Sequence, residues 1–182
     1  FRSKVISISI KDRGAILPGG HTANGSFWYD DVSGNFITST HYMNELPTWV
    51  EQFNAQKWPN KFLQKDWHTL YPIQSYTNST IDDKPYEGLF KGEKTPTFPH
   101  LFKQYVDKKY SMVANMPYGN TLTLEMGKSA ISGEKLGQLG NTDFLALSLS
   151  STDYVGHQFG PNSIEAEDTY LRLDKDLEAF FA

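Results

Sequence analysis

Residues 141–163 read NTDFLALSLSSTDYVGHQFGPNS. An apolar run from Phe144 to Leu149 follows a turn signal and ends in serines. Such a short run is typical of a strand that is buried on both faces of a parallel sheet. Ligands of open α/β sheets bind beyond the carboxyl ends of the strands, so Asp153 falls where such a fold carries its chemistry. The sequence therefore predicts an α/β fold with a functional site after this strand.

A carboxylate and an imidazole follow the predicted strand. His157 comes four residues after Asp153, and Gly156 beside it would let the backbone bend tightly. An aspartate oxygen and a histidine nitrogen can both bind one zinc ion. A pair with this spacing also occurs by chance, so the alternative is two structural side chains. The position after a buried strand favours a metal site.

Two cations follow a second predicted strand. The run from Val5 to Ile10 alternates β-branched residues with serines, which predicts a strand. Side chains alternate along a strand, so Lys11 and Arg13 would point the same way and Asp12 the other way. Arginine can grip phosphate through two hydrogen bonds and lysine adds a point charge, so the pair is suited to an oxyanion. The alternative is a solvated strand end.

The segment after residue 152 continues as a longer pattern, made of Asp153-Tyr-Val-Gly-His157, Gly160-Pro161, Ser163, Glu165, Asp168 and Leu173-Asp174. This pattern resembles the metal-binding segment of the alkaline phosphatase superfamily. The likeness is closest to the type I phosphodiesterase and nucleotide pyrophosphatase branch, including its alkaline phosphatases with a threonine nucleophile. The segment from Ser9 to His21 is similar to the part of those phosphatases that supplies a lysine and an arginine to the phosphoryl oxygens.

The resemblance implies a fold, a cofactor and a substrate class. The fold would be part of an alkaline-phosphatase-like three-layer α/β sandwich with a mainly parallel sheet. Two zinc ions are expected in the intact protein, with Asp153 and His157 as two of the three protein ligands of one of them. Lys11 and Arg13 would bind phosphoryl oxygens. Phosphodiesterase relatives generally lack this cationic pair, so it favours monoesters. The resemblance also implies a periplasmic or secreted location.

The chain is expected to form three parts of one incomplete domain. Residues 1–56 would hold the first strand, a hairpin and a helix. Residues 57–100 are rich in proline and aromatic residues without clear periodicity, and they resemble the family's cap over the metal centre. His68 and His100 in this cap-like insertion are expected to be non-catalytic. Residues 101–182 would hold the α/β core with the metal-binding segment.

Two helices are predicted in the last part of the chain. Asn120 would cap the first, and Asn162 or Ser163 the second. Asp168 in the last helix is most simply a solvated or capping charge. Helical spacing predicts that the buried face of this helix comprises Tyr170, Leu173, Leu177 and Phe180.

The composition excludes several classes of site and partner. The net charge is −4, so the basic footprint typical of nucleic-acid binding is missing. The chain has no cysteine, which excludes disulfides and thiolate metal sites. No apolar run approaches the roughly 18 residues of a membrane span. The expected partner is a small phosphate ester, and the sequence does not indicate an oligomeric state.

The chain is expected to be an internal piece of a longer protein. It begins with Phe1, and an apolar helix face is still running at Ala182. The resemblance lacks its threonine nucleophile, a second Asp-His metal pair and a late histidine ligand, so we expect the piece alone to be inactive. Two alternatives stay open. One is a phosphodiesterase or nucleotide pyrophosphatase, and the other is a non-catalytic module that binds ligands through the aromatic residues of 57–100.

Overall fold

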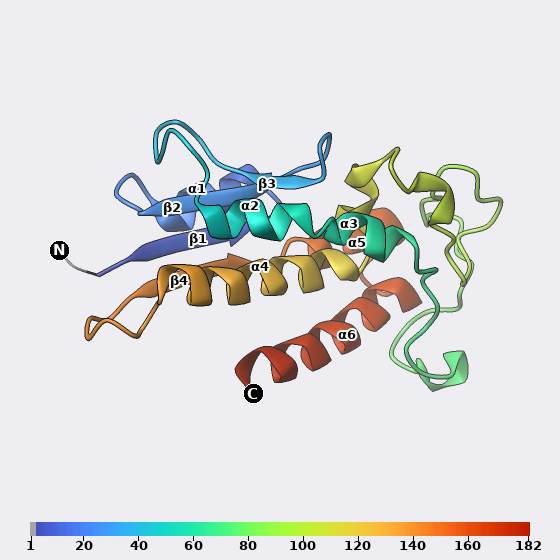
Figure 1. The fold of residues 1–182 in the computed structure, drawn as a ribbon. Helices are drawn as coiled ribbons and strands as arrows, with labels where there is room; N and C mark the ends of the chain where they lie inside the picture. Colours follow the sequence, from blue (N-terminus) through green and yellow to red (C-terminus); the bar gives the residue numbers. More distant parts are fainter. Residues whose placement is uncertain (1–2) are drawn as a thin grey trace. The chain divides into compact units, whose positions relative to one another are not determined.

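The computed structural model describes residues 3–182, so the expectation drawn from Phe1 lies outside the described residues. These residues form two compact units (Figure 1). The first unit runs to Trp58 and resumes from Leu122 to Ser150. The second comprises Pro59–Thr121 and Ser151–Ala182. Each unit is therefore built from segments that are far apart in the sequence.

The first unit is organised around a four-stranded sheet (Figure 1). Strand β1 (Val5–Ser9) pairs in parallel with β2 (Gly25–Asp30) and with β4 (Phe144–Ser148). Strand β3 (Asn35–Ile37) pairs antiparallel with β2. The order is β3-β2-β1-β4. The predicted α/β class with a mainly parallel sheet and the predicted hairpin are both confirmed.

One face of this sheet is polar and lies against helix α1 (Asp12–Gly19). Ser7 and Ser9 of β1 are fully buried on this face. A Cβ atom added to Gly14 would lie 2.5 Å from Ser9 Oγ, and one added to Gly19 would lie 3.2 Å from Ser7 Cβ. The small serines and the two glycines thus let the helix and the sheet approach closely.

The other face of the sheet is apolar and meets α2 (Thr48–Ala55) and the later turns of α4 (Tyr118–Glu134). The ring of Phe27 in β2 packs edge-on against Trp49 of α2, with 5.2 Å between the ring centroids. Trp49 Nε1 donates a hydrogen bond to Glu134 Oε1 of α4 at 2.9 Å. Helix, sheet and helix form the three layers that we expected.

Strand β4 is less buried than its apolar run predicted. It lies at the edge of the described sheet, where only β1 pairs with it. The side chain of Phe144 is 55% exposed, and the four residues after it are half-buried. The prediction of a strand buried on both faces is therefore wrong for the described residues. An edge strand has a neighbouring strand on one side only, so fewer side chains cover its two faces.

The second unit combines helices with a loop-rich segment. It contains α3 (Trp58–Leu63), η1 (Ile73–Ser75), η2 (Lys103–Tyr105), η3 (Tyr110–Asn115), α5 (Ser151–Phe159) and α6 (Ile164–Phe181). Its core is aromatic, with Trp67, Phe102 and Phe159 fully buried. The backbones of Trp67 and His100 exchange two hydrogen bonds, of 2.9 and 3.0 Å. No helix of residues 3–182 meets the length and apolarity that crossing a membrane requires.

Helix α6 buries a different face from the predicted one. Tyr170 is 61% exposed, whereas Asp168 is fully buried. Asp168 Oδ2 accepts a hydrogen bond from Trp67 Nε1 at 2.6 Å, so the interpretation of Asp168 as a solvated or capping charge is wrong. Apolar periodicity cannot reveal a buried carboxylate whose donors come from a distant loop. Ser163 caps the helix as predicted, since its Oγ accepts from the Ala166 N–H at 3.1 Å.

Candidate functional site

Lys11 and Arg13 lie at the start of α1. Strand β1 ends at Ser9, Lys11 has extended backbone before the helix, and Arg13 is in the first helical turn. Strand alternation therefore does not govern the directions of the two side chains, and that part of the prediction is wrong. The reason is that the chain turns into a helix at Asp12.

The start of α1 is a favourable place for an anion. The first turn of a helix presents backbone N–H groups and the positive end of the helix dipole. One of these groups, the Arg13 N–H, already donates to Asp12 Oδ1 at 2.6 Å. The Arg13 side chain is exposed and Lys11 is half-buried. Two cations and a helix start thus lie within three residues of the chain.

Asp153 and His157 lie one turn apart on α5. Helical spacing puts them on the same face, and His157 Nε2 is 3.3 Å from Asp153 Oδ1. Gly156 is an ordinary helical residue, and a Cβ added there would meet no atom within 4 Å. The predicted tight bend at Gly156 is wrong. The regular helix itself brings the carboxylate and the imidazole together.

The pair lines a cavity of about 420 Å³, which Tyr170 of α6 also lines. The side chain of His157 is 80% exposed and that of Asp153 is 51% exposed. An imidazole nitrogen and a carboxylate oxygen are ligands that zinc accepts. Within the described part of the chain, no three such side chains are placed to hold an ion. The pair therefore fits part of a zinc site, because catalytic zinc usually takes three protein ligands.

A buried asparagine holds the start of α5. Asn120 is 1% exposed, and its Oδ1 accepts from the backbone N–H of Ser151 at 3.1 Å. Asn120 lies inside α4, which begins at Tyr118, so the prediction that it caps this helix is wrong. The sequence carries no signal for the contact, because the two residues are 31 positions apart.

The loop-rich segment holds the other end of α5. The Gly88 N–H donates to the carbonyl of Gln158 at 2.7 Å, and the Thr80 N–H donates to the carbonyl of Asn162 at 2.8 Å. Gln158 directly follows His157 in the chain. The segment that we expected to form a cap is thus bonded to the helix end that carries His157.

Known proteins are similar to this chain over its whole length. A family model described as type I phosphodiesterase / nucleotide pyrophosphatase matches residues 3–182. Alkaline phosphatase PhoV of Synechococcus elongatus is 75% identical, over 100% of this chain and 33% of that protein. A Myroides odoratus protein named calcium-transporting ATPase is 57% identical, over 100% and 34%. Alkaline phosphatase PafA of Elizabethkingia meningoseptica is 54% identical, over 100% and 33%.

A solved structure shares the fold. The crystal structure of wild-type alkaline phosphatase PafA matches with a TM-score of 0.96 at 54% identity. The match covers 100% of this chain and 35% of that chain. The chain therefore spans about a third of the length of the relatives that it matches.

Proposed function

Because this chain belongs to the type I phosphodiesterase / nucleotide pyrophosphatase family, we propose that it is part of a zinc-dependent alkaline phosphatase that hydrolyses phosphate monoesters. The observation that carries the proposal is the Asp153–His157 pair, which lies on one face of α5 and lines a cavity. The identity to alkaline phosphatases PhoV and PafA supports the same reaction.

Asp153 and His157 would hold one zinc ion. Zinc, when bound, would supply Lewis-acid stabilisation of the charge on the phosphoryl oxygens. His157 would offer zinc the lone pair of a neutral imidazole nitrogen. Asn120 Oδ1 accepts from the Ser151 N–H and the Gly88 N–H donates to the Gln158 carbonyl, so both ends of α5, which carries the two ligands, are held.

Lys11 and Arg13 would bind the oxygens of the phosphoryl group. A monoester phosphate carries up to two negative charges, whereas a diester carries one. Two cations at the start of a helix therefore stabilise a monoester more than a diester. This difference in charge is the physical reason to prefer monoesters over the diesterase alternative.

The remaining expectations belong to the same proposal. Residues 57–100 would be the cap, and their bonds to the end of α5 support this role. The binding-module alternative loses support, because Trp67 and Tyr76 of this segment are buried in the core. The family resemblance supports a periplasmic or secreted location. Residues 1–182 alone would be inactive, because two protein ligands are too few for catalytic zinc.

Substitutions in the complete protein test the metal ligands. We expect Asp153→Asn and His157→Gln each to remove about one zinc ion per chain and to lower kcat/KM for an aryl phosphate more than about a hundredfold. Asp174→Asn on the exposed side of α6 is the control and should change neither quantity. Unchanged zinc content in both variants, measured by atomic emission, would refute the metal assignment.

A second pair of substitutions tests the substrate class. We expect Lys11→Ala and Arg13→Ala to lower kcat/KM for an aryl monoester by about 10²–10³ and for the matching diester by less. Lys108→Ala removes an exposed cation and serves as control. An equal loss on both substrates would contradict the preference for monoesters.

A further inference from the structure

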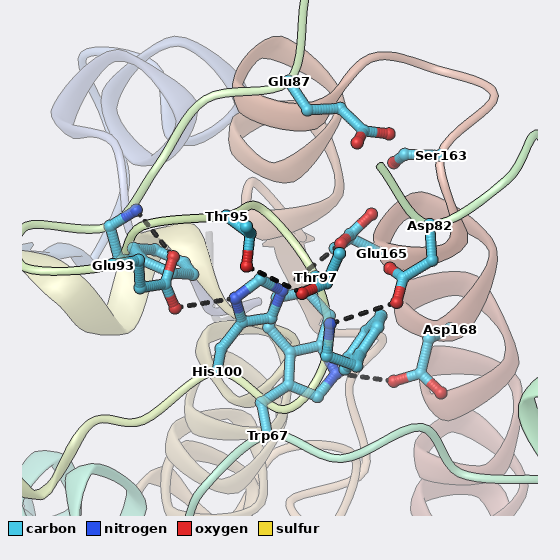
Figure 2. Close-up of polar contacts among 12 residues, drawn as sticks. Trp67, Asp82, Glu87, Glu93, Thr95, Thr97, His100, Ser163, Glu165 and Asp168 are labelled. Atoms are coloured by element: carbon cyan, nitrogen blue, oxygen red, sulfur yellow. Dashed lines mark hydrogen bonds and ion pairs between the residues drawn. The ribbon is translucent and has the colours of Figure 1, made fainter. Parts of the chain in front are cut away.

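A cluster of ionisable side chains is buried in the second unit, between residues 79–100 and α6 (Figure 2). His100 at its centre is fully buried. Its Nδ1 lies 2.9 Å from Glu93 Oε1, and its Nε2 lies 3.3 Å from Glu165 Oε1. One imidazole is thus held between a carboxylate of the loop and a carboxylate of the helix.

Three carboxylate oxygens of this cluster have no hydrogen-bond partner among the described residues: Asp82 Oδ1, Glu87 Oε1 and Glu165 Oε2. Glu165 is fully buried and Glu87 is 8% exposed. The second oxygens of the loop carboxylates are bonded, since the Phe98 N–H donates to Asp82 Oδ2 at 3.2 Å and the Lys84 N–H to Glu87 Oε2 at 2.8 Å. A buried carboxylate oxygen without a donor is costly when the group is ionised.

The charges of the cluster do not balance. Full ionisation would place four negative charges, on Asp82, Glu87, Glu93 and Glu165, against one positive charge on His100. Neighbouring groups do not correct this excess. Asp83 adds a further negative charge from the surface, and Tyr105 near Glu93 carries none in its usual neutral form. Asp168 on α6 has its own partner in Arg172, 2.6 Å away.

Burial and the neighbouring charges shift the pKa values of three members of the cluster. Burial, helped by the charge of Glu165, raises the pKa of Asp82 to about 6. Burial also raises the pKa of Glu87, although the Lys84 N–H opposes the shift. Burial would lower the pKa of His100, but its hydrogen bonds to Glu165 and Glu93 outweigh this effect and raise it. Asp82, Glu87 and His100 therefore bind protons more tightly than they would in water.

The spacing of these groups does not suit a metal ion. Across residues 3–182, no three carboxylates or imidazoles are close enough to hold a metal together. A protonated carboxyl group gains an O–H donor and loses its charge, so it can bond an oxygen that lacks a partner. Figure 2 shows the carboxyl groups of Asp82 and Glu87 on the same side of the cluster as Glu165.

We propose that Asp82 and Glu87 hold protons in the folded protein, and that rising pH removes these protons and loosens residues 79–100 from α6. The same segment is bonded to the end of α5 through Gly88, and to Asn162 in the turn after α5 through Thr80. Loosening it frees the helix end next to His157, so the cluster couples pH to the order of the cap-like segment.

The direction of the pH dependence follows from the raised pKa values. A group with a higher pKa in the folded state stabilises that state fully below its unfolded pKa, and this stability is lost as the pH rises through the folded pKa. For Asp82 this stability is lost as the pH rises from 3.8 to about 6. The contribution of His100 is lost as the pH rises above 6.5, the usual pKa of histidine. Deprotonation of Asp82 alone raises the equilibrium constant for local opening of residues 79–100 about tenfold between pH 5 and pH 9.

Hydrogen–deuterium exchange of the complete protein, corrected for intrinsic exchange rates, measures this opening. In the unchanged protein, protection of residues 79–100 should fall about tenfold or more from pH 5 to pH 9. Asp82→Asn and Glu87→Gln should each reduce the fall, because an amide keeps an acceptor, adds a donor and needs no proton. Asp83→Asn is the matched control on an exposed neighbour and should reduce the fall much less than Asp82→Asn, because the charge of Asp83 has the smallest effect on the pKa of Asp82.

Three results would overturn the proposal. The first is equal protection of residues 79–100 at both pH values in the unchanged protein, and the second is an equal effect of Asp83→Asn and Asp82→Asn. The third is a lower number of bound metal ions in Glu87→Gln, because that result would assign the cluster to a metal ion. If one variant does not fold, the other and the unchanged protein still decide between these outcomes.

Discussion

Among single residues, Asp168 shows how the second unit satisfies a buried charge. Its Oδ1 accepts from the Leu70 N–H and from the Tyr76 hydroxyl, and its Oδ2 accepts from Trp67 Nε1 and Arg172 Nε. Burial, followed by the hydrogen bond to Asp168, raises the pKa of Tyr76 to about 12. An ionised carboxylate can accept four bonds, so this buried charge is fully satisfied.

We predict that Asp168→Asn destabilises the protein by about 3 kcal/mol. The amide turns an NH₂ group toward donors and leaves Arg172 without its ionic partner. The free energy of unfolding in urea, followed by tryptophan fluorescence, measures the change. Asp174→Asn, on the exposed side of the same helix, should stay within about 0.5 kcal/mol. Equal values for the two variants would show that the buried network contributes little.

Among the elements, α1 is one whose position depends on residue size. It lies on the serine face of the sheet, where a Cβ atom at Gly14 would be 2.5 Å from Ser9 Oγ and 3.0 Å from Ser148 Oγ. Both contacts are shorter than a carbon and an oxygen tolerate without movement. The close approach places Lys11 and Arg13 directly beyond the end of β1.

Gly14→Ala should therefore cost about 1–3 kcal/mol, because the helix must move away from β1 and β4. Gly156→Ala is the matched control within α5, where an added Cβ meets nothing within 4 Å. That control should be neutral or stabilising by up to about 1 kcal/mol, as alanine favours helix. The midpoint temperatures of thermal unfolding measure the effect of each substitution. A stable Gly14→Ala protein would mean that α1 is not fixed by this contact.

At the scale of the whole molecule, the chain passes between the two units three times, after Trp58, Thr121 and Ser150. The core of the second unit joins distant segments. Trp67 and His100 come from the loop-rich segment, whereas their partners Asp168 and Glu165 come from α6. Neither segment can bury its polar groups without the other.

Residues 59–121 expressed alone should consequently remain unfolded. Joining them to residues 151–182 through a short glycine-serine linker should restore a fold, because the Asn120 side chain lies 3.1 Å from the Ser151 N–H and the new junction is short. Dispersion of amide signals in NMR spectra distinguishes the two cases. A well-dispersed spectrum from residues 59–121 alone would contradict this account of the second unit.

The sequence predicted the features that depend on local spacing. The alternation in β1, the hairpin of β2 and β3 and the cap at Ser163 follow from contacts between near neighbours in the chain. The Asp153–His157 pair was found for a similar reason, although its helix was not foreseen. Asn120 and Asp168 were misread, because Ser151 lies 31 positions from Asn120 and Trp67 lies 101 positions from Asp168.

By itself, the sequence determined the α/β class, the family resemblance and the residues with the right chemistry, because periodicity and residue type are local properties of the chain. Tertiary structure alone decided which polar groups are buried and what satisfies them. A buried carboxylate such as Glu165 is stable only with donors or protons that surrounding segments bring to it, and the folded chain determines which segments those are.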